Sequence, residues 1–183
     1  MARVGRVTTH NPAPSTPESG HAHERTGRTG RTGRTGRTDV AYRFRTTIDI
    51  RFRDIDALGH VNNAVYLTYF EIARIAYLSA VYGRTLSSLD LGLVVAEAHC
   101  RYRSPAVFGE RLVVEVAMVG LRSRAFELSY RVSVEENGRL VAEGSTVQVA
   151  FNSGTKRVAM LDPTLAAALD RFERGAMESF GHS

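Results

Sequence analysis

The sequence predicts an α+β fold in which an antiparallel sheet of about five strands wraps around one long buried helix. Three observations predict this architecture. Residues 64–82 contain neither Gly nor Pro and are apolar on almost every side, so a helix there must be buried. One segment before this helix and four after it alternate apolar and polar residues with the period of two that is typical of strands. The later segments are joined by short connections, which favour antiparallel neighbours.

The basic charge of the 183-residue chain is concentrated at its N-terminus. Residues 1–38 hold seven Arg against two Glu, a net charge of +5, whereas residues 39–183 hold 17 basic and 17 acidic residues and are neutral. We interpret residues 1–40, with their repeated Arg-Thr-Gly, as a disordered tail, because so few large apolar side chains cannot form a core. Residues 41–183 are long enough for one domain.

The purpose of the tail has two interpretations. It is a low-complexity repeat or a start site assigned too far upstream, or it is an arginine arm that contacts phosphate or anionic lipid. Because the domain is neutral, nucleic-acid binding is not expected of it, and any binding through the arm would be non-specific and salt-dependent.

Other compositional features point to a cytoplasmic protein. Cys100 is the only cysteine, which excludes an internal disulfide. No apolar run reaches the roughly 18 residues of a membrane span, and the N-terminus lacks the apolar segment of a secretory signal. The sequence contains no convincing metal-ligand pattern, and we expect neither a metal nor a cofactor.

The domain is expected to open with a strand and the long helix. Residues 47–53 alternate and predict a half-buried strand with Ile48, Ile50 and Phe52 on its inner face. A polar, Gly-containing break follows at 54–60. Asn62 or Asn63 is then expected to be the N-cap of the helix, and Gly83 to end it.

Four further strands are predicted at 93–103, 110–120, 124–136 and 139–151. Asn137-Gly138 is the strongest short signal for a two-residue hairpin. In the first of these strands the alternation places five side chains inward, namely Val94, Ala96, Ala98, Cys100 and Tyr102. Asp162-Pro163 is expected to begin a short helix, with Pro in its first position.

The residues around the helix start resemble a known family. They read Asp54-Ile-Asp56-Ala-Leu-Gly59-His60-Val-Asn62-Asn63-Ala64-Val-Tyr66-Leu67, followed by Tyr69-Phe70-Glu71-Ile-Ala73-Arg74. This stretch resembles the hotdog-fold thioesterases, and most of all the 4-hydroxybenzoyl-CoA thioesterase-like acyl-CoA thioesterases. The resemblance covers roughly residues 44–160. It implies the hotdog fold and hydrolysis of a fatty or aromatic acyl-CoA to free acid and CoA.

The resemblance also implies catalytic roles. Asp56 matches the family's catalytic carboxylate, which either attacks the thioester or acts as a base for water. The backbone N–H near Asn63 matches the amide that polarises the carbonyl at the helix N-terminus. His60 either orients Asp56 or water, or packs at the junction of loop and helix. The catalytic Asp-x-Asn-x-His set of the plant acyl-ACP branch is incomplete here, because Leu58 replaces its Asn.

Three other polar positions have a structural and a functional interpretation. Asp54 is expected to hold the loop. Glu71 is expected to be buried and paired with Arg74, or to be a second active-site carboxylate. Glu97 and His99 share the polar face of one strand and are expected on the surface or at a subunit interface.

Substrate-binding residues are expected in two regions. Tyr66, with Phe70 and Val95, would lie against the acyl chain. The CoA phosphates would be bound by residues at two turns: Arg122, Ser123, Arg124 and Arg157, with Lys156. The alternative is that the charged residues at these turns are only solvated surface charges.

The resemblance implies a homodimer or homotetramer with active sites between subunits, since open strand edges must be covered. The alternatives are an acyl-ACP thioesterase, a non-catalytic acyl-binding module and a hotdog hydratase. The hydratases have His five residues after Asp in Asp-x-Asn-Pro-x-His, whereas His60 follows Asp56 by four.

Overall fold

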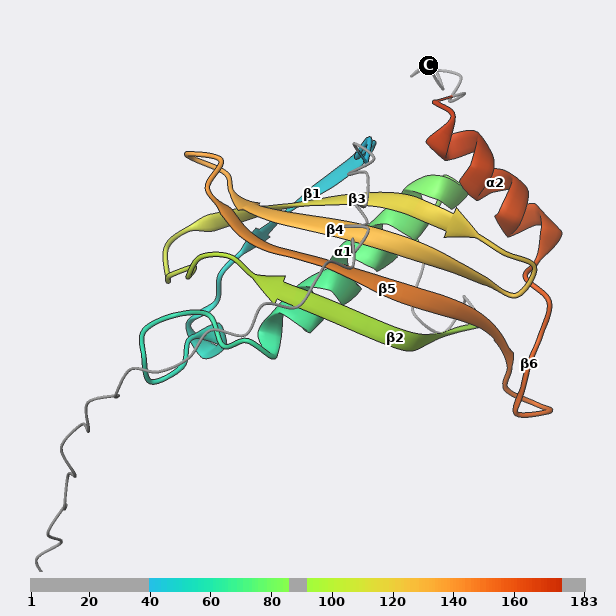
Figure 1. The fold of residues 1–183 in the computed structure, drawn as a ribbon, viewed down its shortest axis with the longest axis horizontal. Helices are drawn as coiled ribbons and strands as arrows, with labels where there is room; N and C mark the ends of the chain where they lie inside the picture. Colours follow the sequence, from blue (N-terminus) through green and yellow to red (C-terminus); the bar gives the residue numbers. More distant parts are fainter. Residues whose placement is uncertain (1–39, 86–91, 176–183) are drawn as a thin grey trace, which may run out of the picture. The chain divides into compact units, whose positions relative to one another are not determined.

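The computed structural model describes residues 40–85 and 92–175 (Figure 1). Of the tail predicted for residues 1–40, only Val40 lies within this part of the chain. The elements, in chain order, are β1 (Phe44–Asp49), a 3-10 turn (Phe52–Asp54), α1 (Val65–Tyr82), β2 (Leu93–Tyr102), β3 (Arg111–Leu121), β4 (Ala125–Val134), β5 (Leu140–Asn152), β6 (Arg157–Val158) and α2 (Pro163–Glu173). No helix in the described ranges is long and apolar enough to cross a membrane.

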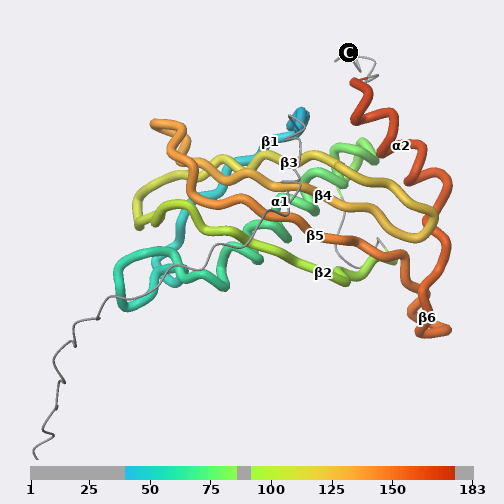
Figure 2. The backbone as a smooth tube through the Cα atoms, viewed as in Figure 1, coloured from blue at the N-terminus to red at the C-terminus, as the bar shows by residue number. Residues whose placement is uncertain are grey.

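The strands form one antiparallel sheet in the order β1-β3-β4-β5-β2, and β6 pairs with β5 (Figures 1 and 2). This confirms the predicted antiparallel sheet, with one difference. β2 does not lie beside β3, because it pairs with β5 along its whole length, from Leu93 opposite Ala150 to Tyr102 opposite Ala142. The connection 103–110 therefore runs from one side of the sheet to the other instead of closing a tight hairpin.

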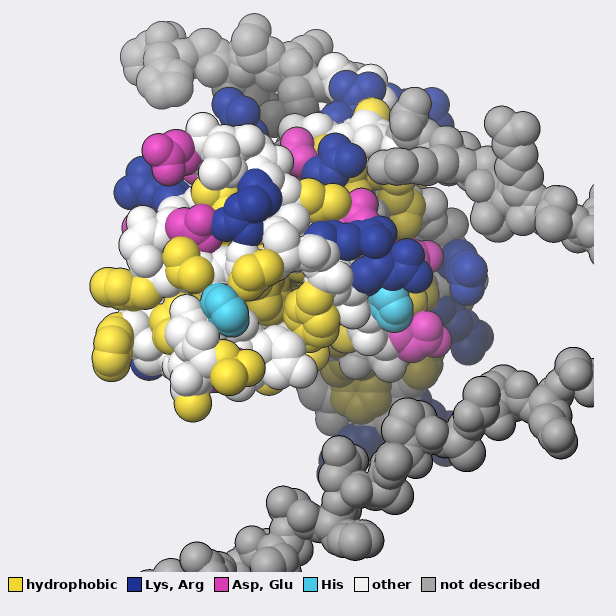
Figure 3. All heavy atoms as spheres, turned by 60° about the vertical axis from the view of Figure 1, so that its left-hand side comes forward, with side chains coloured by type: hydrophobic (Ala, Val, Ile, Leu, Met, Phe, Trp, Pro, Cys, Tyr) yellow, Lys and Arg dark blue, Asp and Glu magenta, His cyan; other side chains and the backbone are white. Residues whose placement is uncertain are grey.

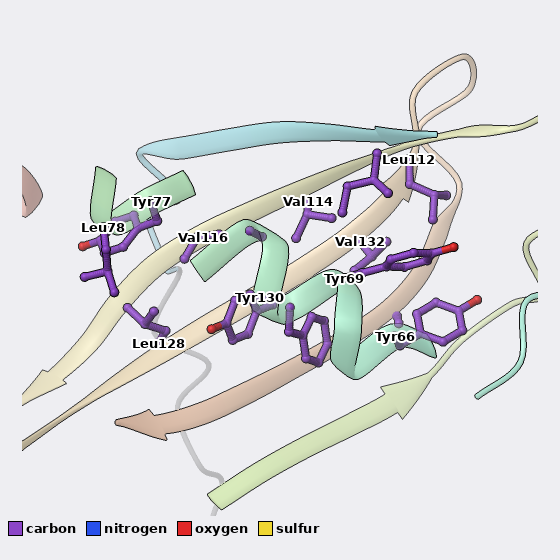
Figure 4. Packing of buried hydrophobic residues seen from close by; sticks show 14 of the residues in the cluster. Tyr66, Tyr69, Tyr77, Leu78, Leu112, Val114, Val116, Leu128, Tyr130 and Val132 are labelled. Carbon is purple, nitrogen blue, oxygen red and sulfur yellow. The ribbon is translucent and has the colours of Figure 1, made fainter. Parts of the chain in front are cut away.

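The core lies between α1 and one face of the sheet (Figure 4). The helix buries Tyr66, Tyr69, Phe70, Ala73, Tyr77 and Leu78 against strand residues such as Leu112, Val114, Val116, Leu128, Tyr130 and Val132. The predicted burial of the helix is confirmed on the side that faces the sheet, but one stripe of the helix is exposed in a single chain. Leu67 is 44% exposed and Ile72 is 39% exposed, because the sheet covers only one side of α1.

Two strand predictions fail for local reasons. The chain leaves the sheet after β1, so Phe52 lies in the 3-10 turn and is 81% exposed instead of facing inward. In β2 the register shifts between Val95 and Glu97, so that Val95 and Ala98 share the face toward α1. A β-bulge of this kind inserts an extra residue and reverses the alternation before it. The predicted inward positions of Val94 and Ala96 are therefore wrong.

Gly144 in β5 leaves room for a side chain of α1 against the sheet beside β2. A Cβ atom at this position would clash with the ring of Phe70 and with the backbone carbonyl of His99. The ring of Phe70 instead stacks on Tyr130, with centroids 4.4 Å apart. Only glycine leaves room for this approach.

Candidate active site

The first half of the loop between β1 and α1 is fixed by a buried carboxylate. Asp54 is 3% exposed and accepts hydrogen bonds from Arg51 N (3.0 Å), Arg51 Nε (3.1 Å), Arg51 Nη2 (3.1 Å) and the Tyr69 hydroxyl (2.9 Å). Burial alone would raise the pKa of the Asp54 carboxyl, but the hydrogen bonds from Arg51 and Tyr69 outweigh it and hold that pKa below its ordinary value. Asp54 thus ties the loop to the helix.

The second half of the loop presents a carboxylate with one oxygen unused. Asp56 begins a turn in which Gly59 N donates to Asp56 O (3.0 Å), and Gly59 adopts φ of 80°, which favours glycine. The backbone N–H of Leu58 donates to Asp56 Oδ1 (2.8 Å). Within the described residues Asp56 Oδ2 has no hydrogen-bond partner. The turn therefore fixes the carboxylate through one oxygen and leaves the other available.

The helix begins with a free backbone amide. Asn62 Oδ1 accepts from Ala64 N (2.9 Å) and Asn62 O accepts from Val65 N (3.0 Å). The N-cap is Ala64, so the predicted N-cap at Asn62 or Asn63 is wrong in position, although the Asn62 side chain satisfies one of the first amides. The N–H of Asn63 finds no acceptor in the described part of the chain. It lies at the end of the helix where the dipole is positive.

A cavity of about 380 Å³ joins these groups. Its lining comes from three segments: Asp56, His60, Val61 and Asn63 from the loop, Tyr66 from α1, and Tyr102, Arg103, Ser104 and Pro105 from β2 and the connection after it. A volume of this size suits a small-molecule site. The cavity brings together the predicted residues Asp56, His60, Asn63 and Tyr66.

Apolar side chains are exposed near this cavity. Phe52, Leu58 and Phe108 are 81%, 80% and 59% exposed, and the rings of Phe52 and Phe108 meet edge to face with centroids 6.0 Å apart. Figure 3 shows hydrophobic side chains gathered on this side of the molecule, together with several Lys or Arg side chains.

His60 is half-buried in the wall of the cavity. Its carbonyl accepts from Asp56 N (2.9 Å), and its backbone forms an isolated β-bridge with Val107. Its imidazole makes no hydrogen bond to Asp56 or to any other described residue, so both interpretations of His60 stay open. Within residues 40–85 and 92–175, no group of three or more His, Cys, Asp or Glu is arranged to hold a metal ion.

Tyr66 and Tyr102 form the aromatic side of the cavity. Their ring centroids are 5.3 Å apart, and the Tyr102 hydroxyl donates to the carbonyl of Asn63 (2.8 Å). Burial raises the pKa of Tyr66 to about 12, so its hydroxyl is neutral at physiological pH. The hydrogen bond from Tyr102 fixes the peptide group between Asn63 and Ala64, which follows the free N–H of Asn63.

Sequence reasoning missed the wall formed by Tyr102, Arg103, Ser104 and Pro105. Tyr102 and Arg103 were assigned only to a strand, and the following residues carried no motif. The one available signal was the length of the connection 103–110, which exceeds what a tight hairpin needs.

The predicted CoA-binding residues lie at the opposite end of the sheet. Arg124 O accepts from Ala150 N (2.9 Å), and Ala150 pairs with Leu93 at the first residue of β2. The cavity lies at the last residue, Tyr102, which is about 30 Å away at a strand rise of about 3.3 Å per residue. Arg122, Ser123 and Arg157 share this distant end, since Ser123 O accepts from Leu161 N (2.9 Å) and Arg157 pairs with Asn152.

Glu71 does not belong to the cavity. Its side chain is 54% exposed and lies 3.8 Å from Arg74 Nη2. The expectation of a buried carboxylate is wrong, because Glu71 is on the side of α1 that the sheet leaves uncovered. The expected pairing with Arg74, whose side chain is 14% exposed, is present at this long distance and remains as the role of Glu71 in the fold.

The chain matches thioesterases in both sequence and structure. The profile of the thioesterase-like superfamily matches residues 50–169. The chain is 27% identical over 128 residues to the long-chain acyl-CoA thioesterase FadM of Escherichia coli (strain K12), covering 69% of this chain and 97% of that relative. It is 29% identical over 124 residues to a 1,4-dihydroxy-2-naphthoyl-CoA hydrolase of Rippkaea orientalis, covering 65% and 89%.

Among solved structures, a thioesterase from Thermus thermophilus, crystallised with coenzyme A and Zn, superposes with a TM-score of 0.65 at 34% identity over 73% of this chain and 96% of that one. A 1,4-dihydroxy-2-naphthoyl-CoA thioesterase from Synechocystis has the same fold, with a TM-score of 0.63 at 23% identity over 69% and 95%. The loop, the helix start and these matches agree, and the chain belongs to the thioesterase-like superfamily of hotdog-fold thioester hydrolases.

Proposed function

We propose that the protein is an acyl-CoA thioesterase that hydrolyses a fatty or aromatic acyl-CoA with Asp56 as the catalytic carboxylate. The observation that carries this proposal is the pairing, in one cavity, of a carboxylate with an unused oxygen and a free backbone amide. Thioester hydrolysis needs a group that activates water or attacks the carbonyl, and a donor for the oxyanion that develops. Asp56 and the N–H of Asn63 supply these two functions.

The reaction proceeds by proton transfer in the general-base form of this mechanism. Asp56 Oδ2 takes a proton from a water molecule as the water oxygen forms a bond to the thioester carbonyl carbon. The carbonyl oxygen becomes an oxyanion that accepts from Asn63 N–H. The tetrahedral intermediate then collapses, the C–S bond breaks, and the sulfur leaves with the proton held by Asp56. The products are the free acid and CoA.

Replacement of the carboxylate tests the catalytic role directly. Asp56→Asn preserves the turn, because the amide oxygen still accepts from Leu58 N, but it cannot remove a proton. We expect kcat for acyl-CoA to fall at least a thousand-fold while the thermal midpoint changes little. Normal turnover in Asp56→Asn would exclude this mechanism.

Isotope labelling and trapping together separate base from nucleophile. In a single turnover in H₂¹⁸O with enzyme in excess, ¹⁸O in the Asp56 peptide would establish a nucleophilic Asp56 whose anhydride is hydrolysed at the aspartyl carbonyl. Label in the product acid alone is expected for a general base and also for hydrolysis of the anhydride at its acyl carbonyl. Hydroxylamine added during turnover distinguishes these two, because it converts an anhydride at Asp56 to a hydroxamate that mass spectrometry detects, whereas a general base forms no such adduct.

We further propose that β2 forms the seam of a homodimer. Eight of its ten residues are exposed, and Val94, Val95 and Tyr102 are 42%, 42% and 48% exposed. A long apolar edge strand invites pairing unless it is covered. The exposed Leu67 and Ile72 of α1 also need a partner surface. A second copy that pairs through its own β2 would cover both.

An antiparallel dimer through β2 would also complete the substrate site. A twofold axis at the middle of β2 sets the Tyr102 end of one copy beside the Leu93 end of the other. Arg122, Arg124 and Arg157 of one copy would then approach the Asp56 cavity of the other. That arrangement would bring further guanidinium groups toward the CoA phosphates, whereas the cavity's own Arg103 is paired with Glu143.

Mixing of inactive variants tests this dimer. Asp56→Asn lacks the carboxylate, and a variant with Arg122, Arg124 and Arg157 all changed to Gln lacks the phosphate contacts. If sites form between subunits, mixed dimers regain one intact site and about half of wild-type activity per mixed dimer. A monomer in sedimentation, or no recovery after subunit exchange has been verified, would contradict the proposal.

The acyl group is best identified with a substrate panel. Fatty acyl-CoA of increasing length, aromatic acyl-CoA and the matching acyl-ACP thioesters should be compared by kcat/KM. We expect CoA thioesters to exceed acyl-ACP thioesters, because the proposed arginine set is suited to the CoA phosphates.

A further inference from the structure

One wall of the cavity is a connection that needs support from elsewhere. Residues 103–110 join β2 to β3 and contribute Ser104 and Pro105 to the lining. This connection is attached to the catalytic loop by the backbone bond from Val61 N to Ala106 O (2.9 Å) and by the bridge between His60 and Val107. Any shift of the connection is therefore transmitted to the loop that carries Asp56 and His60.

The guanidinium of Arg139 fixes this wall from the β4–β5 hairpin. Arg139 follows Asn137-Gly138, and its backbone N–H donates to Asn137 Oδ1 (3.0 Å). Its Nη1 donates to Ser104 Oγ (2.9 Å) and, in a short bond, to the carbonyl of Pro105. Ser104 Oγ in turn donates to Leu140 O (2.7 Å). The contacts of Arg139 thus reach two residues that line the cavity.

The second half of the arrangement is Glu110, at the far end of the same connection. Its Oε1 accepts from Arg139 Nη2 (2.5 Å), and its Oε2 accepts from the backbone N–H of Val107 (3.0 Å). The two side chains are partly buried, at 35% exposure for Arg139 and 20% for Glu110. Glu110 therefore connects the guanidinium to Val107, which pairs with the backbone of His60.

We propose that the Arg139–Glu110 pair positions the wall of the cavity for thioester hydrolysis, a role that rests on the function proposed above. Neither residue lines the cavity, so both act through Ser104, Pro105, Val107 and, beyond them, His60. A guanidinium suits this task because its planar fork holds several acceptors in fixed directions, which an ammonium cannot do. Small displacements matter here, since a misplacement of about 1 Å can lower the rate about a hundred-fold.

Two conservative variants and a matched control test the proposal. Glu110→Gln removes the charge of the pair, and Arg139→Lys keeps the charge but removes the fork. Asp49→Asn is the control, because it removes the charge from a more exposed ion pair, between Arg111 Nε and Asp49 Oδ1 (2.7 Å), that does not touch the wall. All are compared with the wild-type full chain well below their unfolding midpoints.

We expect both variants to lower kcat at least ten-fold with KM changed less than three-fold, and Asp49→Asn to stay within two-fold of the wild type. A purely structural pair would affect only the folded fraction. A kcat per folded molecule within two-fold of the wild type in both variants would therefore overturn the proposal. So would an increase in KM alone, because that change means uniform substrate binding and not positioning.

The imidazole of His60 gives a readout that does not need turnover. Its ring proton resonance, identified by its absence in His60→Asn, should shift in Glu110→Gln and Arg139→Lys but not in Asp49→Asn. Unchanged resonances in both variants would overturn the positioning role, whether or not the protein hydrolyses acyl-CoA. If the wild type hydrolyses no acyl-CoA, the proposed function fails, and the resonances still test the positioning role. If Asp56→Asn is inactive while Glu110→Gln and Arg139→Lys turn over normally, the function stands and the positioning role falls.

Discussion

The two halves of the loop between β1 and α1 each contain an aspartate, but one aspartate is buried and the other is partly exposed. Residues 51–55 hold Asp54, which is buried and accepts from one arginine and one tyrosine. Residues 56–63 hold Asp56, which is partly exposed and uses only one oxygen within the fold. A carboxylate whose two oxygens both accept hydrogen bonds within the fold contributes to stability and has no oxygen left for catalysis. The difference shows how one short segment can be rigid and still offer a reactive group, because the first half anchors what the second half presents.

The largest contrast in stability is expected between Asp54→Asn and Asp56→Asn. Asp54→Asn removes the charge that accepts hydrogen bonds from Arg51 and from the Tyr69 hydroxyl, and we expect it to lower the unfolding free energy clearly, because the site is buried. Asp56→Asn should cost less than about 0.5 kcal/mol, as is usual for a change away from the core. Urea unfolding of both variants measures this contrast. Equal losses would contradict the division of the loop into an anchor and a reactive half.

Acid should remove the stability that Asp54 contributes to the fold. The pKa of Asp54 is lower in the folded protein than in an unfolded chain, where a carboxyl group titrates near pH 4. Its contribution to stability is therefore fully present above about pH 4 and is lost as the pH falls through the lower, folded pKa. Glu110 adds a contribution of the same sign, because hydrogen bonds from Val107 and Arg139 outweigh the effect of burial and lower its pKa.

Unfolding midpoints in urea between pH 6 and pH 2 measure this dependence. The decline below pH 4 should become shallower in Asp54→Asn than in the wild type. An unchanged slope in Asp54→Asn would assign the acid sensitivity to other carboxylates.

A smaller effect is expected at the junction between the loop and the helix. Asn62→Ala removes the acceptor for Ala64 N–H, and loss of one such hydrogen bond costs about 1 kcal/mol. It should also lower kcat several-fold, because the first turn of α1 presents the amide of Asn63. Stability loss with unchanged kcat would indicate that this turn needs no help from Asn62.

The smallest effect is expected one residue later. Asn63→Ala removes a side chain but keeps the backbone N–H that we assign to the oxyanion. The kcat should remain within about two-fold of the wild type and the thermal midpoint within about 2 °C, since exposed substitutions cost little unfolding free energy. A large loss of kcat would transfer the role from the backbone to the Asn63 amide group.

Sequence reasoning succeeded where local patterns determine the structure. The period-two segments became β2 to β5, the apolar run became α1, and Asp162 caps α2 by accepting from Thr164 N (2.8 Å). The motif around Asp56 predicted which residues of the loop gather at the helix start. These features depend on neighbours in the chain, so a single sequence carries them.

The failures concern what distant segments do to one another. Nothing in the alternation of β2 reveals the bulge after Val95 or the pairing with β5 that sends the strand to the far edge. The wall at Ser104 and Pro105 depends on that pairing and on Arg139, which lies more than thirty positions away in the chain. Likewise, the exposure of Glu71 follows from how much of α1 one sheet can cover, which an apolar helix pattern does not specify.

Gly144 has a consequence for how this sequence can change over generations. Glycine weakens a strand interior, so a substitution there would ordinarily be tolerated or even favoured. Here any side chain would displace the ring of Phe70 and the backbone of β2. Position 144 is therefore closed to mutational drift while its outward-facing neighbours remain free to vary. A saturation library of β5 should return glycine alone at this position, which makes it a sensitive internal gauge of whether selected variants retain the helix against the sheet.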